Sequence, residues 1–134
     1  MPAHLVNKII DTLVYNETMI LYVSATQGEA AQVPSDYPLI VTGIGIIRAT
    51  LALTEYLARA DELPERIINF GTAGSLNGNT GIFEIDHVFQ HDFDHKVIEQ
   101  IIGKPFPNGI DLPTVSTLPA ARLATGDSFV NDPN

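Results

Sequence analysis

The chain has no cysteine, which excludes a disulfide framework, a thiolate zinc site and a cysteine nucleophile. Basic residues are also scarce, because 7 Lys and Arg stand against 16 Asp and Glu, for a net charge of −9. Such a chain repels phosphate backbones and anionic lipids, so neither nucleic acid nor a membrane surface is an expected partner. No apolar run approaches the roughly 18 residues of a membrane-spanning helix. Residues 1–18 lack the layout of a signal peptide, and we therefore expect a cytoplasmic protein.

What the chain does contain indicates a folded α/β domain. Apolar residues make up 45% of its 134 positions. The apolar spacing predicts an amphipathic helix within residues 1–18 and an α/β domain over residues 19–134. Strands are predicted over 19–24, 38–42, 66–70, 81–90 and 120–125, and helices over 46–60 and 96–102. Residues 103–119 hold four of the nine prolines and are expected to be irregular. Strands that alternate with helices favour a layered fold with a largely parallel sheet.

The strand at 66–70 opens into a loop of small residues, G-T-A-G at 71–74. Glycine allows the backbone to approach a ligand closely, so this loop is a candidate binding segment. Glu29 follows another buried strand by five residues, and such loops gather at the ligand-binding edge of a parallel sheet. A glutamate that complements the dipole of a helix N-terminus would give the same pattern. Both interpretations of Glu29 remain open on spacing alone.

A second glycine-rich segment, T-G-I-G-I-I-R-A, also follows a predicted strand and opens a helix. A dinucleotide fingerprint would need a third glycine where Arg48 stands, and an acid after the next strand. Both are missing. The pattern therefore favours a tight turn that lines a small-molecule site, with a purely structural turn as the alternative.

Two further groups of residues could carry chemistry. Imidazole and carboxylate groups cluster in one short segment and suggest a zinc or manganese site, although a solvated loop is favoured because no distant partner motif exists: His87, His91, Asp92, Asp94 and His95. Phe129 follows a Gly-Asp-Ser turn, where an exposed ring could stack on a flat base. A core phenylalanine is the alternative for Phe129, and the sequence pattern alone favours it.

Five segments, taken in order, resemble the purine nucleoside phosphorylase/nucleosidase superfamily, and within it the 5′-methylthioadenosine/S-adenosylhomocysteine nucleosidase branch. They are M-I-L-Y-V-S-A-T-Q-G-E-A, L-I-V-T-G-I-G, I-I-N-F-G-T-A-G-S-L, H-V-F-Q-H-D-F-D-H and L-A-T-G-D-S-F-V-N. The resemblance implies a three-layer α/β/α fold with a mostly parallel mixed central sheet. It also implies a homodimer that hydrolyses a 5′-modified adenosine without a metal or other cofactor.

The resemblance also implies roles for individual residues. Glu29 falls on the general base that activates water, and Thr72 on the hydroxyl that helps to hold that water. Ala73 and Gly74 belong to the substrate-binding glycine loop. Phe129 falls on the ring that stacks on the purine, and Val130 on the residue whose backbone reads the adenine edge. The segment 89–95 falls near the dimer interface and the 5′ substituent.

Two departures from the superfamily pattern qualify this expectation. Phosphorylases carry an arginine just before the glycine loop, but Asn69 and Phe70 stand there, so water is the expected nucleophile rather than phosphate. The second carboxylate and the general acid of the family fall beyond Asn134. We therefore expect either an N-terminal portion of a longer enzyme or a truncated product, and in both cases a chain that is inactive alone. The alternatives are a nucleoside-binding or assembly fragment and a nucleoside phosphorylase.

Overall fold

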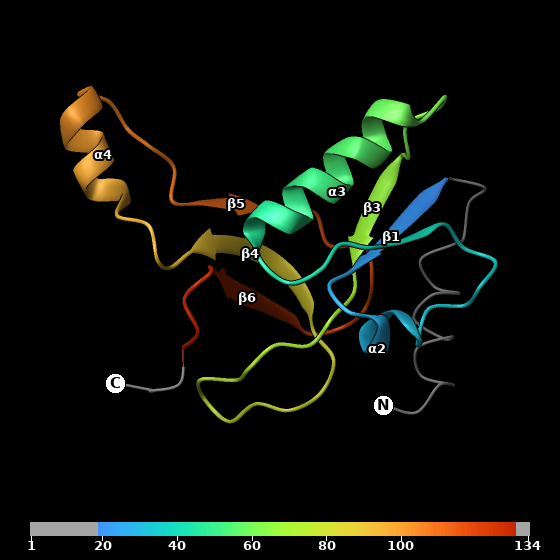
Figure 1. Ribbon diagram of the computed structural model, residues 1–134. Coiled ribbons are helices and arrows are strands. Elements are labelled where there is room, and N and C mark those ends of the chain that lie inside the picture. Colours follow the sequence, from blue (N-terminus) through green and yellow to red (C-terminus); the bar gives the residue numbers. More distant parts are fainter. Residues whose placement is uncertain (1–18, 131–134) are drawn as a thin grey trace. The chain divides into compact units, whose positions relative to one another are not determined.

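The computed structural model describes residues 19–130, which fall into two compact units divided between Gly74 and Ser75 (Figure 1). The amphipathic helix predicted within residues 1–18 lies outside the described residues. The predicted α/β class is confirmed, because the described part of the chain contains three helices and six strands in two small sheets. Across residues 19–130, no helix is both long and apolar enough to cross a membrane.

The N-terminal unit contains a fully parallel three-stranded sheet. Its elements are β1 (Ile20–Ser24), α2 (Gln27–Ala30), β2 (Leu39–Val41), α3 (Ile46–Arg59) and β3 (Arg66–Asn69). The strand order is β2-β1-β3, and Tyr22 of β1 pairs with Leu39 on one side and Ile68 on the other. Because all three strands run the same way, their carboxyl ends meet at one edge. The loops that follow β1, β2 and β3 therefore gather there.

Strand β1 forms the centre of this unit and is buried along its whole length. A continuous apolar run suits a strand that is covered on both faces, which explains why the sequence predicts it well. Its residues Ile20 and Tyr22 form a core cluster with Val33, against which partly buried residues in and beside β2 and β3 pack. At the end of β1 the buried Ser24 hydroxyl donates to the Phe70 carbonyl over 2.7 Å. This bond ties the start of the glycine loop to the end of the central strand.

The C-terminal unit contains a mixed three-stranded sheet. Its elements are β4 (Glu84–Gln90), α4 (His95–Ile102), β5 (Gly109–Asp111) and β6 (Ala120–Thr125). In the order β5-β4-β6, β4 pairs antiparallel with β5 and parallel with β6. An irregularity in the β4–β6 register between Ile85 and His87 interrupts the regular alternation that the sequence predicts for β4.

The prediction that residues 103–119 are wholly irregular is wrong, because β5 lies within them. This strand has only three residues and lies between prolines, so its own sequence gives no strand signal. Its pairing with β4 defines it instead. The described strands form one parallel and one mixed sheet rather than a single sheet. The three-layer fold with one central sheet therefore stays a prediction.

Candidate functional site

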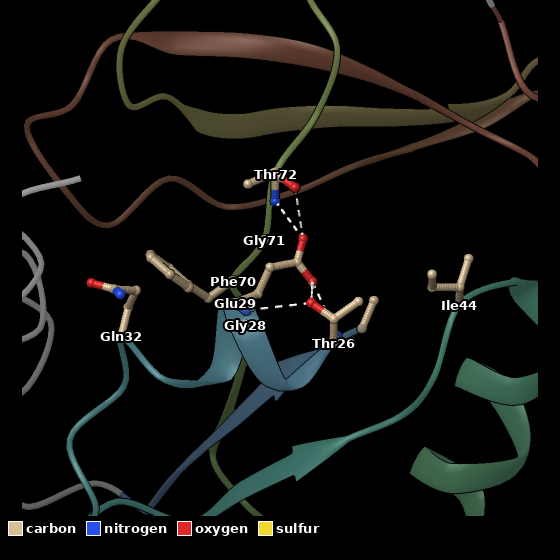
Figure 2. Close-up of a pocket in the computed structure, with 9 residues that line it drawn as sticks. Thr26, Gly28, Glu29, Gln32, Ile44, Phe70, Gly71 and Thr72 are labelled. Atoms are coloured by element: carbon tan, nitrogen blue, oxygen red, sulfur yellow. Dashed lines mark hydrogen bonds between the residues drawn. The ribbon is translucent and has the colours of Figure 1, made fainter.

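An open pocket of about 600 Å³ lies at the carboxyl edge of the parallel sheet in the N-terminal unit (Figure 2). Ligand pockets typically span about 300–1,000 Å³. Loops after all three strands line it: Ala25, Thr26, Gly28, Glu29, Gln32, Ile44, Phe70, Gly71 and Thr72. The strand order changes side at β1, because β2 lies on one side of it and β3 on the other, and α/β sheets bind ligands outside the strand ends at such a point.

Glu29 enters the pocket because a capping box fixes the first turn of α2. Thr26 is the N-cap, and its hydroxyl accepts a hydrogen bond from the Glu29 N–H over 3.3 Å. In return Glu29 Oε2 accepts from the Thr26 N–H over 3.1 Å and from the Thr26 hydroxyl over 3.0 Å. The helix-terminus interpretation of Glu29 is therefore correct for one carboxylate oxygen.

The other oxygen of Glu29 reaches the glycine loop after β3. Glu29 Oε1 accepts from both the N–H and the hydroxyl of Thr72, each over 2.8 Å. Figure 2 shows the carboxylate between the two threonines, Thr26 near α2 and Thr72 on the loop. Thus the two residues singled out in the sequence as a catalytic pair are in direct contact, and all four donors point at one carboxylate.

These donors keep Glu29 ionised. The Thr72 N–H contributes most to lowering the pKa of the Glu29 carboxyl below the usual 4.5, partial burial opposes it, and the remaining threonine donors add to the lowering. A lowered pKa in the folded state means that these bonds stabilise the fold above the ordinary pKa of glutamate. That contribution is lost as the pH falls through the lowered value. At neutral pH Glu29 is therefore a carboxylate, and the four hydrogen bonds that it accepts fill its roughly four acceptor positions.

Gly71 allows the carboxylate to come this close to the loop. A Cβ at position 71 would lie 3.5 Å from Glu29 Cδ, which is an ordinary van der Waals contact, but 3.1 Å from Glu29 Oε1, which is tighter than one. Glycine at this position therefore leaves room for the close approach that the sequence predicts, whereas a Cβ would make the neighbouring group shift by a few tenths of an ångström. The group that approaches the loop here is the side chain of Glu29.

We expect Gly71→Ala to displace the Glu29 carboxylate by a few tenths of an ångström and weaken its bonds to Thr72. Loss of these bonds should lower the free energy of unfolding by about 1 kcal/mol. It should also raise the pKa of Glu29 toward its ordinary value, which carboxyl NMR can follow. Gly74→Ala is the matched control, since a Cβ there has no atom within 4 Å. An unchanged Glu29 pKa in Gly71→Ala would contradict this description of the loop.

The other predicted site residues of the N-terminal unit do not line this pocket. Ala73 and Gly74 are exposed and continue the loop beyond Thr72. Phe129 and Val130 belong to the C-terminal unit, where their exposed fractions are 91% and 48%. The alternative that Phe129 is a core residue is wrong, because its ring is almost wholly exposed.

The polar segment at the end of β4 contains several separate interactions. His87 contacts Asp111 over 2.6 Å, and Asp94 caps α4 by accepting from the Val97 N–H over 3.1 Å. Asp92 binds the backbone of the Gly126–Ser128 turn. Within residues 19–130, no group of three histidine or acidic side chains is arranged to hold a metal ion. The metal hypothesis therefore gains no support from the described residues.

Sequence reasoning missed several residues that shape the site. The Thr26 cap could have been found, since T-Q-G-E is the spacing of a capping box. The buried Ser24 hydroxyl and the lining side chains of Gln32 and Ile44 carry no comparable local signal. Their positions depend on how β1, β2 and β3 pair.

One comparison with known proteins agrees with the resemblance found in the sequence. The chain is similar to 5′-methylthioadenosine/S-adenosylhomocysteine nucleosidase from Marinomonas sp. (strain MWYL1), with 29% identity over 117 residues. The match covers 73% of this chain and 50% of that protein, so the chain spans about half the length of the curated relative it matches. No protein-family profile and no solved structure matches it. The chain thus shows distant, partial similarity to the nucleosidases.

Proposed function

We propose that this chain carries the water-activating part of a nucleosidase that hydrolyses the N-glycosidic bond of a 5′-modified adenosine. The observation that carries the proposal is the Glu29 carboxylate, held by Thr72 in a pocket at the carboxyl edge of a parallel sheet. The similarity to a methylthioadenosine/S-adenosylhomocysteine nucleosidase supports the choice of substrate class.

In the proposed reaction a water oxygen bonds to C1′ of the ribose as the bond from C1′ to the purine nitrogen breaks. The transition state resembles an oxocarbenium ion, as in glycoside hydrolysis. Glu29 takes the proton that the water loses, and the departing purine takes up a proton at nitrogen from a general acid or from solvent. The products are free adenine and the 5′-modified ribose. One water is consumed.

Glu29 must release one of its four donors before it can accept this proton, because a carboxylate offers about four acceptor positions. The Thr72 hydroxyl is the donor we propose to move, since its rotation frees a site on Oε1 while the Thr72 N–H stays bound. The water then replaces the hydroxyl hydrogen at Oε1, and the Thr72 oxygen can accept from that water. Thr72 would therefore both hold the carboxylate and orient the nucleophile.

The lining of the pocket favours water over phosphate as the nucleophile. Glu29 is the only ionisable residue among the described residues that line it. A phosphate dianion would meet this carboxylate without a cation to balance it, whereas neutral water would not be repelled.

On the resemblance, we further propose that Phe129 stacks on the adenine and that Val130 reads its edge through the backbone. Ala73 and Gly74 are proposed to contact the sugar. The finer arrangement, a three-layer α/β/α fold with one mostly parallel sheet in a homodimer, is proposed on the same basis. A stacking role for Phe129 is consistent with the exposure of its ring.

Incubation of the whole encoded polypeptide with methylthioadenosine, with and without phosphate, tests the proposal. We expect adenine and free methylthioribose at equal rates in both conditions, measured by chromatography of the products. A phosphate-dependent reaction that yields the sugar 1-phosphate would identify a phosphorylase instead. Tight binding by calorimetry without adenine release would identify a nucleoside-binding module. The absence of both binding and release would overturn the assignment.

A further inference from the structure

The parallel pairing of β4 with β6 ends at a defined point, and beyond it a side chain accepts the backbone hydrogen bonds. Gln90 and Thr125 are the last pair in register, and the His91 N–H still donates to the Thr125 carbonyl over 3.0 Å. The next segment of the chain, Gly126 to Ser128, has left the strand. Its backbone N–H groups are therefore no longer bonded within the sheet, so water or a side chain can accept from them.

Asp92 supplies the acceptor. Its Oδ2 accepts from the Asp127 N–H over 2.7 Å and from the Ser128 N–H over 2.9 Å. Gln90 Nε2 donates to Oδ1 over 3.0 Å and so orients the carboxylate. Hydrogen bonds from the Ser128 backbone, then from Gln90 and Asp127, lower the pKa of Asp92 to about 2. Asp92 is thus ionised across the physiological range and binds two consecutive backbone amides.

Gly126 makes this contact sterically feasible. A Cβ at position 126 would lie 2.7 Å from Asp92 Oδ2 and 2.6 Å from His91 Nε2. Any other residue at position 126 would have to push the carboxylate away from the turn. The two sides of the contact, an acid after β4 and a glycine after β6, therefore depend on each other.

The segment that this carboxylate holds leads directly to Phe129, whose ring is 91% exposed. An apolar ring at the surface gains nothing from folding, whereas fixing its backbone lowers the entropy lost when a flat partner stacks on it. We propose that Asp92 is the positioning residue for Phe129, holding the turn before it so that its ring is presented to a purine. The identity of the ligand, a purine, rests on the proposed function. The contact between Asp92 and the turn can be tested without any ligand.

The first measurement needs no nucleoside. The chain contains no tryptophan, so Phe129→Trp introduces a single fluorophore at the end of the turn. When Asp92→Ala is added to this variant, we expect the fluorescence anisotropy of the tryptophan to fall. Amide hydrogen exchange at Asp127 and Ser128 should become faster by at least about tenfold. Gly126→Ala should do the same from the other side of the contact.

The second measurement uses adenine, titrated calorimetrically into the full chain. We expect Asp92→Ala to weaken binding by roughly tenfold, since the turn must then be ordered on binding. Asp92→Asn should restore most of the affinity, because its side-chain oxygen can still accept from both amides. Asp61→Ala, a surface acid on the connection before β3, is the matched control.

The outcomes separate this inference from the proposed function. Unchanged anisotropy and exchange in Asp92→Ala would overturn the positioning role, whether or not adenine binds. A turn that loosens while the affinity stays constant would also overturn it. If the unmodified chain binds no adenine and Asp92→Ala still loosens the turn, the proposed function fails and Asp92 has no purine to position.

Discussion

Glu29→Gln is expected to reduce adenine release from methylthioadenosine by about 10²–10⁴-fold, the usual contribution of a general base. Glutamine cannot take the proton from water at neutral pH, so the chemical step is lost while the nucleoside can still bind. The comparison is best made by single-turnover kinetics on the whole encoded polypeptide, together with calorimetric binding of the nucleoside. A variant with full turnover would remove Glu29 from the mechanism.

The same substitution should affect folding as well, which provides an independent check of the geometry. Glutamine has one side-chain oxygen, so its amide group must face the donors of either Thr26 or Thr72. We expect the free energy of unfolding to fall by about 1–3 kcal/mol, measured by urea denaturation. Glu62→Gln is the control, since it makes the same chemical change at an exposed position outside the pocket.

Phe129→Ala is expected to weaken adenine binding by about 5–150-fold, which corresponds to the roughly 1–3 kcal/mol that base–aromatic stacking supplies. Because the ring is almost wholly exposed, the free energy of unfolding should change by less than about 0.5 kcal/mol. Calorimetric titration and urea denaturation measure the two quantities. Phe129→Tyr keeps an aromatic face and should bind nearly as well as the unmodified chain.

Phe106→Ala gives the opposite pattern and serves as the control. Its ring packs against Phe93 with the centroids 6.1 Å apart and against His95 at 5.6 Å. We expect this variant to lose stability and to retain its affinity for adenine. Equal affinities in Phe129→Ala and the unmodified chain would exclude stacking by Phe129.

The parts of the fold that sequence predicts are those with strong local signals. The apolar run at 19–24 and the glycine loop at 71–74 appear where they were expected, as β1 and the loop after β3. Strand β5 was missed because three residues between prolines form a strand only when β4 is beside them. Pattern within one segment cannot reveal a partner strand some twenty positions away.

The same division applies to the site. Glu29 was singled out by its position after a buried strand and Thr72 by the family resemblance, but the sequence does not predict that one carboxylate would accept four bonds. The pair is separated by 43 positions, and the contact exists only because β1 and β3 are neighbours in the sheet. Asp92 was interpreted as a residue of a solvated loop, because nothing in its own segment indicates the backbone amides that it binds.

The strand order β2-β1-β3 also determines when the pocket can form during synthesis. β1 emerges from the ribosome first, but its bond from Ser24 to Phe70 spans 46 positions and must wait for the last strand of the sheet. Contacts of such long range are slow to form and leave the unpaired strand exposed in the meantime. The carboxylate of Glu29 therefore has no Thr72 to bind until the chain has grown past the glycine loop. We expect the nascent N-terminal unit to need protection by chaperones up to that length.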